Sequence, residues 1–179
     1  MKLIRTAAVL VMAFVALIGG VASANASPLA SRLTLVTPAN IKALSSVVHP
    51  LSNQGTCLDV YANGKGPWVQ VWTCNGQANQ QFYTVGYTDA NNWEIRSTDS
   101  WCVDARYGRG ASLQHSPCTG IAGERFNLYW DTLYGGSWVI ESAEYPGEVW
   151  DVYDSGRGTE VQLWDYNRTP NQEWAGLQV

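Results

Sequence analysis

The sequence predicts an all-β protein with a closed, threefold-repeated body, and three observations support this prediction. A unit recurs three times between residues 46 and 179, with 45 residues between the aspartates of the first two copies and 47 between those of the second and third. Short segments of the unit alternate apolar and polar residues at period two, which is typical of half-buried strands. Glycine- and asparagine-rich stretches separate these segments and indicate turns.

Each copy of the unit carries three blocks in a fixed order. An aspartate lies in the first block, a glutamine lies in the second, and an aromatic residue closes the third. The fourth residue of the second block precedes the closing aromatic residue by 10 positions in every copy. The blocks are residues 57–60, 69–74 and 79–82; residues 102–105, 113–118 and 123–126; and residues 149–152, 161–166 and 171–174.

The second block shows the strand pattern most clearly. Val69 and Val71 alternate with Gln70 and Trp72, and residues 161–164 repeat this alternation. Each unit has room for about four short strands. One unit alone cannot bury its apolar face, so the three units are expected to close on one another. Closure also removes exposed sheet edges. After residue 26, only the window 41–48 shows a weak helical period.

The four cysteines follow the repeat. Cys57 and Cys74 occupy the same two positions as Cys102 and Cys118, and the third copy has no cysteine at either position. Because both thiols are lost together, we predict one disulfide within each of the first two repeats, Cys57–Cys74 and Cys102–Cys118, against the alternative of free buried thiols. Each would contribute roughly 3 kcal/mol in the chain-entropy model.

The N-terminal segment resembles a secretory signal peptide. Lys2 and Arg5 precede an apolar run over residues 7–18, and small residues follow, which is the pattern of such a signal. We expect residues 1–26 to contain a signal peptide that is cleaved after Ala24 or Ala26. The protein is therefore expected to be secreted and extracellular. The run is shorter than the about 20 residues that a membrane-spanning helix needs. No later segment is apolar enough for membrane insertion.

The remaining chain is long enough for one domain. Residues 27–45 are expected to be a leader or linker, because Pro28 and Pro38 discourage regular structure. The domain is expected to span residues 46–179, with repeats at approximately 46–90, 91–137 and 138–179. The first strand is expected to start near residues 46–49.

Composition limits the partners. Without Lys2 and Arg5, 9 basic residues stand against 15 acidic ones, a net charge of −6. A protein that binds a phosphate backbone needs a basic patch, so nucleic acid is not expected as a partner. All nine tryptophans lie after residue 67. Indole side chains are large and apolar, so this excess indicates burial or use in binding contacts.

The motifs resemble those of the ricin B-type lectin family. The sequence opens its first repeat with Cys-Leu-Asp-Val, carries Gln-x-Trp in the middle of two repeats, and closes with Gln-x-Trp or Gln-x-Phe. The resemblance covers about residues 46–179. It implies a β-trefoil of three four-stranded repeats with pseudo-threefold symmetry, in which a six-strand barrel is capped by three hairpins. It also implies up to one sugar pocket per repeat.

A sugar ring has an apolar face and a rim of hydroxyls, so its pocket needs a flat aromatic ring and polar groups that pair with hydroxyls. In the first repeat, Asp59 would accept from hydroxyls in a wet pocket, Trp72 would stack on the ring, and Asn79 would bond a hydroxyl. Gln70 and Gln80 would brace the site or contact the sugar. The third-repeat residues that resemble this carbohydrate-binding set are Asp151, Gln162, Trp164, Asn171 and Gln172.

The second repeat departs from the pattern. It keeps Asp104 and Gln114 but has Ser116 at the position of the tryptophan. Gly123 and Glu124 replace the Asn-Gln pair. The stacking ring and most of the polar rim are therefore missing, and this degenerate site is expected to be silent or weaker.

Structural roles are the alternative for several of these residues. A repeated aspartate can cap a turn through its side chain, and this interpretation is favoured for Asp104 over Asp59 and Asp151. His115 or Tyr107 is an alternative aromatic group for the second repeat, although nothing in the sequence sets its direction.

The aromatic residues divide into two groups. Trp72 and Trp164 alternate with core-facing aliphatic residues, so we expect them to be exposed rather than part of the core. The three residues that close the repeats are expected to lie in the core: Phe82, Phe126 and Trp174.

No catalytic machinery is expected. The sequence lacks a Gly-x-Ser-x-Gly elbow, and His49 and His115 occupy no recognisable catalytic setting. A glycosidase needs two carboxylates beside the bond it cleaves, but the cluster of Glu141, Glu144 and Glu148 is interpreted as a solvated acidic loop. No metal-ligand motif or phosphate-binding loop occurs, so neither metal nor cofactor is predicted.

The sequence therefore predicts a secreted carbohydrate-binding lectin with two intact pockets, in the first and third repeats. The expected partners are glycans, either galactose-type sugars or plant and cell-surface polysaccharides. The alternative is a protein–protein module, either the targeting subunit of a toxin or a trefoil of the protease-inhibitor kind. The sequence names neither the sugar nor a protein partner.

Overall fold

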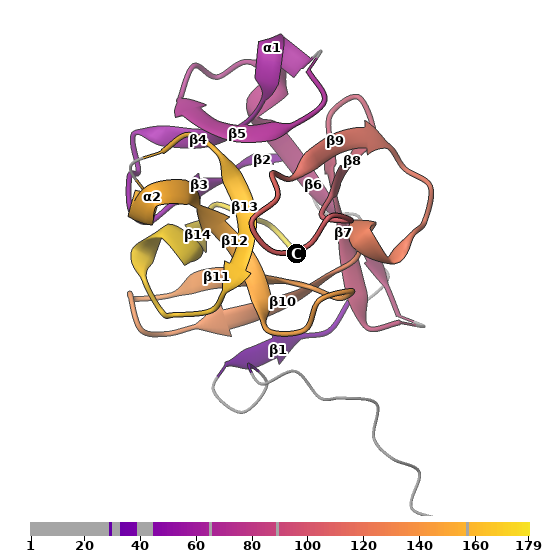
Figure 1. Ribbon diagram of the computed structural model, residues 1–179, viewed down its shortest axis with the longest axis vertical. Helices are drawn as coiled ribbons and strands as arrows, with labels where there is room; N and C mark the ends of the chain where they lie inside the picture. The colour runs from indigo at the N-terminus through magenta and orange to yellow at the C-terminus, as the bar shows by residue number, and fades with distance from the viewer. Residues whose placement is uncertain (1–28, 30–32, 39–44, 65, 89, 157) are drawn as a thin grey trace, which may run out of the picture.

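The computed structural model describes residues 29, 33–38 and 45–179, except 65, 89 and 157 (Figure 1). The predicted signal peptide, most of the leader and residues 41–44 of the weak helical window lie outside these residues. Among the described residues, no helix has the length and apolar character needed to cross a membrane.

Strands from all three repeats close into a barrel. Along the described chain, consecutive repeats pair β6 with β7 and β10 with β11, and β14 pairs with β3 to join the last repeat to the first. Every one of these pairs is antiparallel. The barrel strands are β2 (Ser46–Val47) with β3 (His49–Pro50), β6 (Gln81–Tyr87), β7 (Asn92–Ser97), β10 (Phe126–Asp131), β11 (Ser137–Ser142) and β14 (Trp174–Ala175).

Three hairpins cap one end of the barrel. They lie at the top, right and left of centre in Figure 1. Backbone hydrogen bonds join them, from Val69 N–H to Leu113 O at 2.9 Å and from Leu113 N–H to Val161 O at 2.8 Å. This architecture confirms the predicted β-trefoil. The hairpins are β4 (Thr56–Val60) with β5 (Val69–Thr73), β8 (Trp101–Asp104) with β9 (Gln114–Pro117), and β12 (Glu148–Val152) with β13 (Val161–Asp165).

Short helical turns complete the repeats. A single α-helical turn follows the first hairpin strand in the first and third repeats, as α1 (Tyr61–Gly64) and α2 (Tyr153–Gly156). A 3₁₀ turn precedes the last strand of each repeat, at Ala78–Gln80, Ala122–Glu124 and Pro170–Gln172.

The core combines aliphatic and aromatic residues and lies within the barrel and under the cap. The closing residues Phe82, Phe126 and Trp174 are all fully buried, which confirms the prediction for them. Trp150 from β12 packs edge-on against both Phe126 and Trp174, with ring centroids 5.1 and 5.9 Å apart. Edge-to-face pairs of this kind add to the free energy gained by burying apolar surface.

Both predicted disulfides are present. Cys57 bonds Cys74 and Cys102 bonds Cys118. Each bridge joins the first strand of a cap hairpin to the residue that directly follows its second strand. The described chain has no free cysteine.

The leader differs from its expected irregular form. Strand β1 (Thr34–Val36) pairs antiparallel with β10, with Leu35 opposite Tyr129. Leu29 and Leu33 are buried in a small apolar cluster with Tyr129. Pro38 follows β1 and so does not interrupt it. The described part of this segment therefore packs against the domain, with β1 at the bottom of Figure 1.

The interpretation of Glu141, Glu144 and Glu148 as a solvated acidic loop is wrong for Glu141. Glu144 is exposed and Glu148 is half-buried, but Glu141 lies in β11 and is fully buried. Its carboxylate accepts hydrogen bonds from the Asn127 amide at 2.9 Å and the Gly147 N–H at 2.8 Å. A buried charge needs such donors. Asn127 lies on the neighbouring strand β10, and Gly147 lies in the loop that follows β11.

The leader packing leads to a stability prediction. Leu33→Ala is expected to lower the free energy of unfolding by about 2 kcal/mol, because it leaves a cavity in a buried cluster. Leu35→Ala is the matched control, since Leu35 is 38 % exposed and its loss is expected to cost less than about 0.5 kcal/mol. Urea unfolding of both variants measures the difference, and equal stability of the two would contradict this account.

A second buried acid lies beside the third repeat. The Glu173 carboxylate accepts the Ser137 hydroxyl at 2.7 Å and lies 2.9 Å from the Tyr166 hydroxyl. That same hydroxyl is 2.9 Å from the Asp131 carboxylate, and it has one proton to share between two acids. Burial, helped by the Asp131 charge, raises the pKa of Glu173 to about 7.

This raised pKa predicts pH-dependent stability. The native protein binds a proton at Glu173 up to about pH 7, whereas the unfolded chain releases it near the ordinary value of 4.5. The free energy of unfolding is therefore expected to fall by about 2–3 kcal/mol as the pH rises from 4.5 to 7. Glu173→Gln is expected to remove this loss, which thermal unfolding at a series of pH values would measure. An unchanged pH profile would contradict the assignment.

Candidate functional site

The first candidate site is centred on Asp59, at the end of β4 beside α1. The register of the hairpin places Gln70 opposite Asp59. The Asp59 carboxylate accepts three amide hydrogen bonds, from Gln70 at 3.0 Å, Asn79 at 2.7 Å and Gln80 at 2.9 Å. Four of the five predicted residues are thus joined in one hydrogen-bonded group, with Trp72 beside them on β5.

The third repeat reproduces this group. The Asp151 carboxylate accepts hydrogen bonds from Gln162 at 3.2 Å, Asn171 at 2.8 Å and Gln172 at 2.9 Å. The partner oxygens also match, because Gln162 binds Oδ1 and the other two amides bind Oδ2. Two copies of one arrangement, built 92 residues apart from Asp59 to Asp151, indicate a common purpose.

The sequence led us to expect the aspartates in wet pockets, but both are buried. Asp59 is 2 % exposed and Asp151 is 4 % exposed. Burial raises the pKa of Asp151, and the hydrogen bonds from its three amide partners oppose that rise. A carboxylate offers about four acceptor positions, so the three amides leave one position on Oδ1 for another donor.

The two second glutamines brace the pocket from beneath. Gln80 and Gln172 are fully buried, which leaves no surface for contact with a ligand. Each donates to its aspartate and accepts from a loop N–H with its oxygen, from Asn75 at 2.8 Å and Asn167 at 2.8 Å. Of the two roles considered for them, support of the site fits their position.

A hollow lies above each aspartate. The first has a volume of about 220 Å³ and is lined by Asp59, Tyr61, Ala62, Gln70, Trp72 and Asn75. The third-repeat hollow has the same volume and is lined by Asp151, Tyr153, Asp154, Gln162, Trp164, Asn167 and Asn171.

The two indoles are exposed, as expected, but to different degrees. Trp72 is 53 % exposed and Trp164 is 37 % exposed. The guanidinium of Arg109, from the second repeat, lies 4.4 Å above the Trp164 ring and pairs with Asp165 at 2.7 Å. One face of the third-repeat indole is therefore covered by a cation, while the hollow reaches the indole elsewhere.

Two aromatic residues of the site were missed from the sequence. Tyr61 and Tyr153 line the two hollows. Both follow an Asp-Val pair, and this Asp-Val-Tyr motif, shared by the first and third repeats, is the sequence signal that could have identified them. In both repeats the helical turn ends at a glycine with positive φ, and Gly64 lies against the Cβ of Asn79, so the turn packs closely on the site.

The second repeat holds its aspartate differently. Arg106 occupies the position of the two tyrosines and forms an ion pair with Asp104. The Arg106 N–H also donates to Asp104 Oδ1 at 2.9 Å, which confirms that this aspartate caps a turn. A Cβ added to Gly123 would lie 2.8 Å from the Arg106 backbone, so this turn leaves no room for an asparagine. Gln114 donates to Ser112 O instead of Asp104.

Glu124 replaces the bracing glutamine, and neither aromatic candidate forms a pocket with Asp104. Glu124 is fully buried and accepts from the Thr119 N–H at 2.9 Å, as Gln80 accepts from Asn75. His115 is buried, with Nε2 2.8 Å from the Ser97 hydroxyl. His115 lines a different hollow, of about 160 Å³, together with Ser97 and Asp99. Tyr107 is 66 % exposed and lines neither hollow.

Metal ligation has little support among the described residues. Two groups bring three ligand atoms together, one with His49 and one with Glu94. Each group also contains both sulfur atoms of a disulfide. A sulfur in a disulfide is not a thiolate, which is the form that binds metal.

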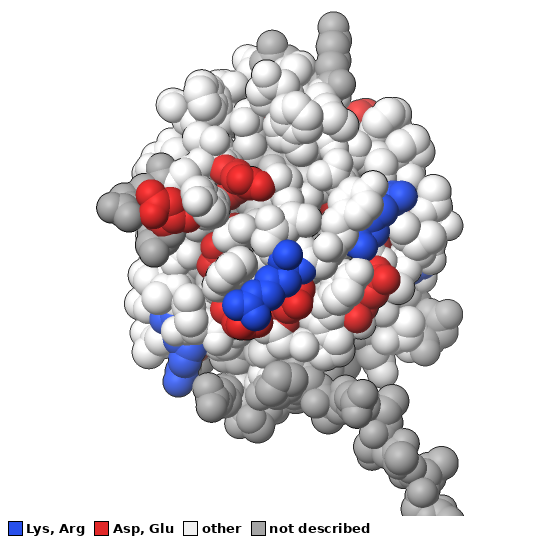
Figure 2. All heavy atoms as spheres, in the orientation of Figure 1, with Lys and Arg blue, Asp and Glu red and all other residues white. Residues whose placement is uncertain are grey.

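The surface charge is sparse and mixed. On the face shown in Figure 2, basic side chains are few and do not merge into a continuous patch. Uncharged surface covers most of this face. Polar uncharged groups and aromatic rings therefore dominate the chemistry that the cap presents.

A family comparison agrees with this geometry. The sequence profile of the ricin-type β-trefoil lectin domain matches residues 46–174. The chain belongs to this lectin family. A sequence comparison with curated proteins finds no significant match.

Solved structures similar to this lectin domain share its fold at low identity. A mosquitocidal holotoxin matches with a TM-score of 0.66 and 13 % identity over 75 % of this chain, which spans only 17 % of the toxin chain. The designed threefold-symmetric protein ThreeFoil matches with a TM-score of 0.64 and 20 % identity over 75 % of this chain and 99 % of that chain. The C-terminal half of an earthworm R-type lectin, in complex with GalNAc, matches with a TM-score of 0.56 and 18 % identity over 75 % and 98 %.

The three amide side chains that donate to Asp59 predict how a negative charge added at Gln80 would change stability. Gln80→Glu in the lectin domain places a second carboxylate beside Asp59, so the free energy of unfolding at pH 7 is expected to fall by about 2 kcal/mol or more. Part of the loss is expected to return near pH 4, where protonation relieves the repulsion. Urea unfolding at both pH values measures this.

Gln81→Glu is the matched control for this charge. Gln81 is adjacent in the chain and lies in β6, so the same charge added there is expected to change stability by less than about 0.5 kcal/mol. If both variants lose equal stability, the amide group is not what holds the carboxylate.

Proposed function

We propose that this protein is a secreted lectin that binds glycans through two pockets, one in the first repeat and one in the third. The observation that carries the proposal is the pair of matched hollows, each joining an exposed indole to an amide-held aspartate. Galactose-type sugars and plant or cell-surface polysaccharides are the proposed ligands. The earthworm lectin of the same fold, which is in complex with GalNAc, supports the first of these.

In this proposal, a sugar ring lies against the indole of Trp72 or Trp164 through its apolar C–H face. The free acceptor position of the aspartate receives one sugar hydroxyl. Asn171 lines the third-repeat hollow, and its side-chain oxygen is available to a ligand because its amide nitrogen donates to Asp151. Asn79 also donates to its aspartate but does not line the first hollow. The rim is polar and held in place before binding, which lowers the entropic cost of recognition.

The amide cradle supports a binding role rather than a catalytic one. Asp59 is the one carboxylate that lines the first hollow, whereas a glycosidase uses two flanking carboxylates. The third-repeat hollow is also lined by Asp154, but the equivalent residue in the first-repeat hollow is Ala62. The two pockets share one equivalent carboxylate each, Asp59 and Asp151, which is one fewer than glycoside hydrolysis needs. The arrangement that they share therefore suits ligand recognition. We therefore propose that the protein has no catalytic activity of its own.

Secretion is proposed from the sequence of residues 1–26 and from the two disulfides. Disulfides persist in oxidising compartments outside the cytosol. A lectin placed there meets the polysaccharides and cell surfaces that carry its proposed ligands.

Two shallow pockets on one rigid body favour multivalent binding. A single sugar is expected to bind with a dissociation constant near 1 mM, about −4 kcal/mol. A surface dense in glycans engages both pockets at once, which is expected to raise the apparent affinity by about 10²-fold. Polyvalent glycans should therefore bind far more tightly than monosaccharides.

The two indoles test this proposal. Trp72→Ala and Trp164→Ala are each expected to remove one site and to lower retention on a glycan polymer by at least about tenfold, because the avidity of two sites is lost. The double variant is expected to lose binding. A glycan array followed by titration calorimetry with the best ligands measures all three.

Trp101→Ala is the control for the loss of an exposed indole. Trp101 is 41 % exposed, lies in the second repeat and lines neither pocket. Its loss is expected to leave the array pattern unchanged. Normal retention of the double variant on glycan polymers would overturn the assignment of both sites.

A further inference from the structure

A third hollow lies where the hairpins of the cap meet. Its volume is about 320 Å³, larger than either sugar pocket. Trp68, Ser112 and Glu160 occupy the same position in the three repeats, directly before or within the start of the second hairpin strand. Because each repeat supplies its equivalent residue, the hollow lies about the pseudo-threefold axis. Its lining is Trp68, Val69, Gln70, Ser112, Thr159 and Glu160.

The walls of this axial hollow are chemically unlike one another. Val69 is buried beneath the opening, and Trp68 is 39 % exposed beside it. The Ser112 hydroxyl donates to the Glu160 carboxylate, which holds that acid in place. An indole over an apolar floor, with hydroxyls and a carboxylate opposite, matches the apolar face and polar rim of a sugar ring.

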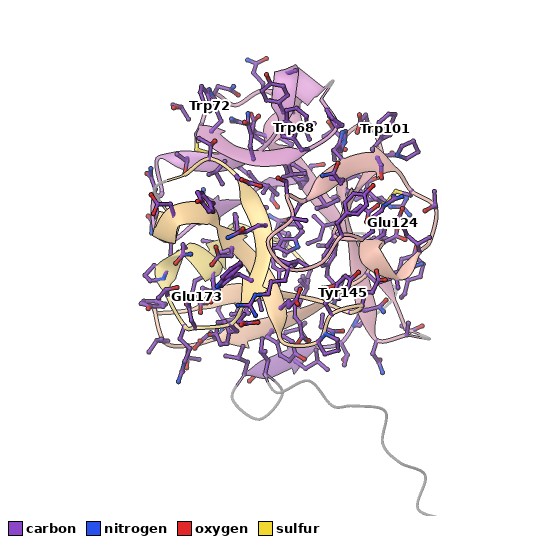
Figure 3. All side chains as sticks on the ribbon, in the orientation of Figure 1. Trp68, Trp72, Trp101, Glu124, Tyr145 and Glu173 are labelled. Atoms are coloured by element: carbon purple, nitrogen blue, oxygen red, sulfur yellow. A yellow bond between two sulfur atoms is a disulfide. The ribbon has the colours of Figure 1, made fainter. Side chains whose placement is uncertain are left out.

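The axial hollow adjoins the first-repeat pocket. Gln70 lines both. Tyr61 lines the pocket and stacks on Trp68, with ring centroids 4.6 Å apart and an interplanar angle of 25°. Figure 3 shows Trp68 and Trp72 at the same end of the molecule, on the first repeat. Aromatic surface thus runs from Trp72 through Tyr61 to Trp68.

We propose, resting on the function proposed above, that the axial hollow is a second subsite of the first-repeat pocket. It takes the next unit of a neutral oligosaccharide whose first unit lies on Trp72. The Glu160 carboxylate accepts hydroxyls of that unit and disfavours uronic and other acidic sugars by charge repulsion.

The third repeat lacks this extension. Its residue at the position of Trp68 is Glu160, which presents no ring for Tyr153 to stack on. The aromatic surface of the third pocket therefore stops at Tyr153. The first pocket recognises a chain, whereas the third recognises a single unit.

The experiment compares sugar lengths at one pocket at a time. Trp164→Ala isolates the first pocket and Trp72→Ala isolates the third. Titration calorimetry measures each variant with galactose and β-1,4-galactotetraose, with xylose and xylotetraose, and with arabinose and arabinotetraose. The quantity of interest is the ratio of monosaccharide to tetrasaccharide dissociation constants.

The first pocket alone is expected to bind one tetrasaccharide about tenfold more tightly than its monosaccharide, more than the gain from the number of units in the chain. Adding Trp68→Ala is expected to abolish this advantage, while Trp68→Tyr, which keeps an aromatic ring, retains most of it. Adding Trp101→Ala is the control and keeps the ratio. The third pocket alone is expected to show no length preference beyond the number of units.

The outcomes separate the two proposals. If monosaccharides bind both single-pocket variants but Trp68→Ala keeps the tetrasaccharide advantage, the subsite is wrong and the lectin function stands. A length preference in the third pocket equal to that in the first also overturns the subsite. If none of the sugar pairs binds either variant, the two-pocket proposal fails and the subsite fails with it.

Discussion

The carboxylate held by three amides is the interaction on which both candidate pockets depend. Each aspartate lies on a hairpin strand of the cap with almost no solvent contact, and an ionised group there needs compensation. The three amide donors supply it, and in doing so they join both hairpin strands and the 3₁₀ turn before the last strand. The position of the exposed indole follows from that junction, because the same strand carries Trp72 and Gln70. Removal of any one partner leaves the others with an incompletely paired charge.

The repeat made the architecture predictable from the sequence. The similar spacing of Asp59, Asp104 and Asp151, 45 and 47 residues, placed equivalent residues in equivalent positions, so the barrel, the cap and the two disulfides followed. The pockets could be predicted in outline for the same reason. The buried state of the aspartates could not, because it depends on how tightly α1 and the 3₁₀ turn pack. Contacts between repeats, such as Arg109 over Trp164, break the threefold pattern and leave no signal within a single repeat.

The leader and Glu141 show a second limit of sequence reasoning. β1 is three residues long and exists because β10 offers it an edge. Nothing local in Thr34–Val36 distinguishes such a strand from a linker. Glu141 likewise has the side chain of a surface residue, and its burial follows from donors on Asn127 and Gly147. In both cases a partner lies on another strand, β10 for β1 and Asn127 of β10 for Glu141, so composition alone points the wrong way.

The second repeat shows how one site can change without loss of the fold. An acid at Glu124 and an acid at Asp104 are tolerated together because Arg106 neutralises one and loop N–H groups bind the other. Gly123 then accommodates the turn that Arg106 makes. The three changes, to Arg106, Gly123 and Glu124, are interdependent, so restoring a single residue would leave a clash or an unpaired charge.

The pseudo-threefold axis also determines the directions in which the two candidate pockets open. Rotation by about a third of a turn relates the first hairpin to the third, so the two pockets open away from each other. A single straight glycan strand is poorly placed to fill both on one molecule. Under the proposed two-pocket function, the protein would bridge neighbouring strands and gather branched or densely packed polysaccharides into networks rather than wrap them individually.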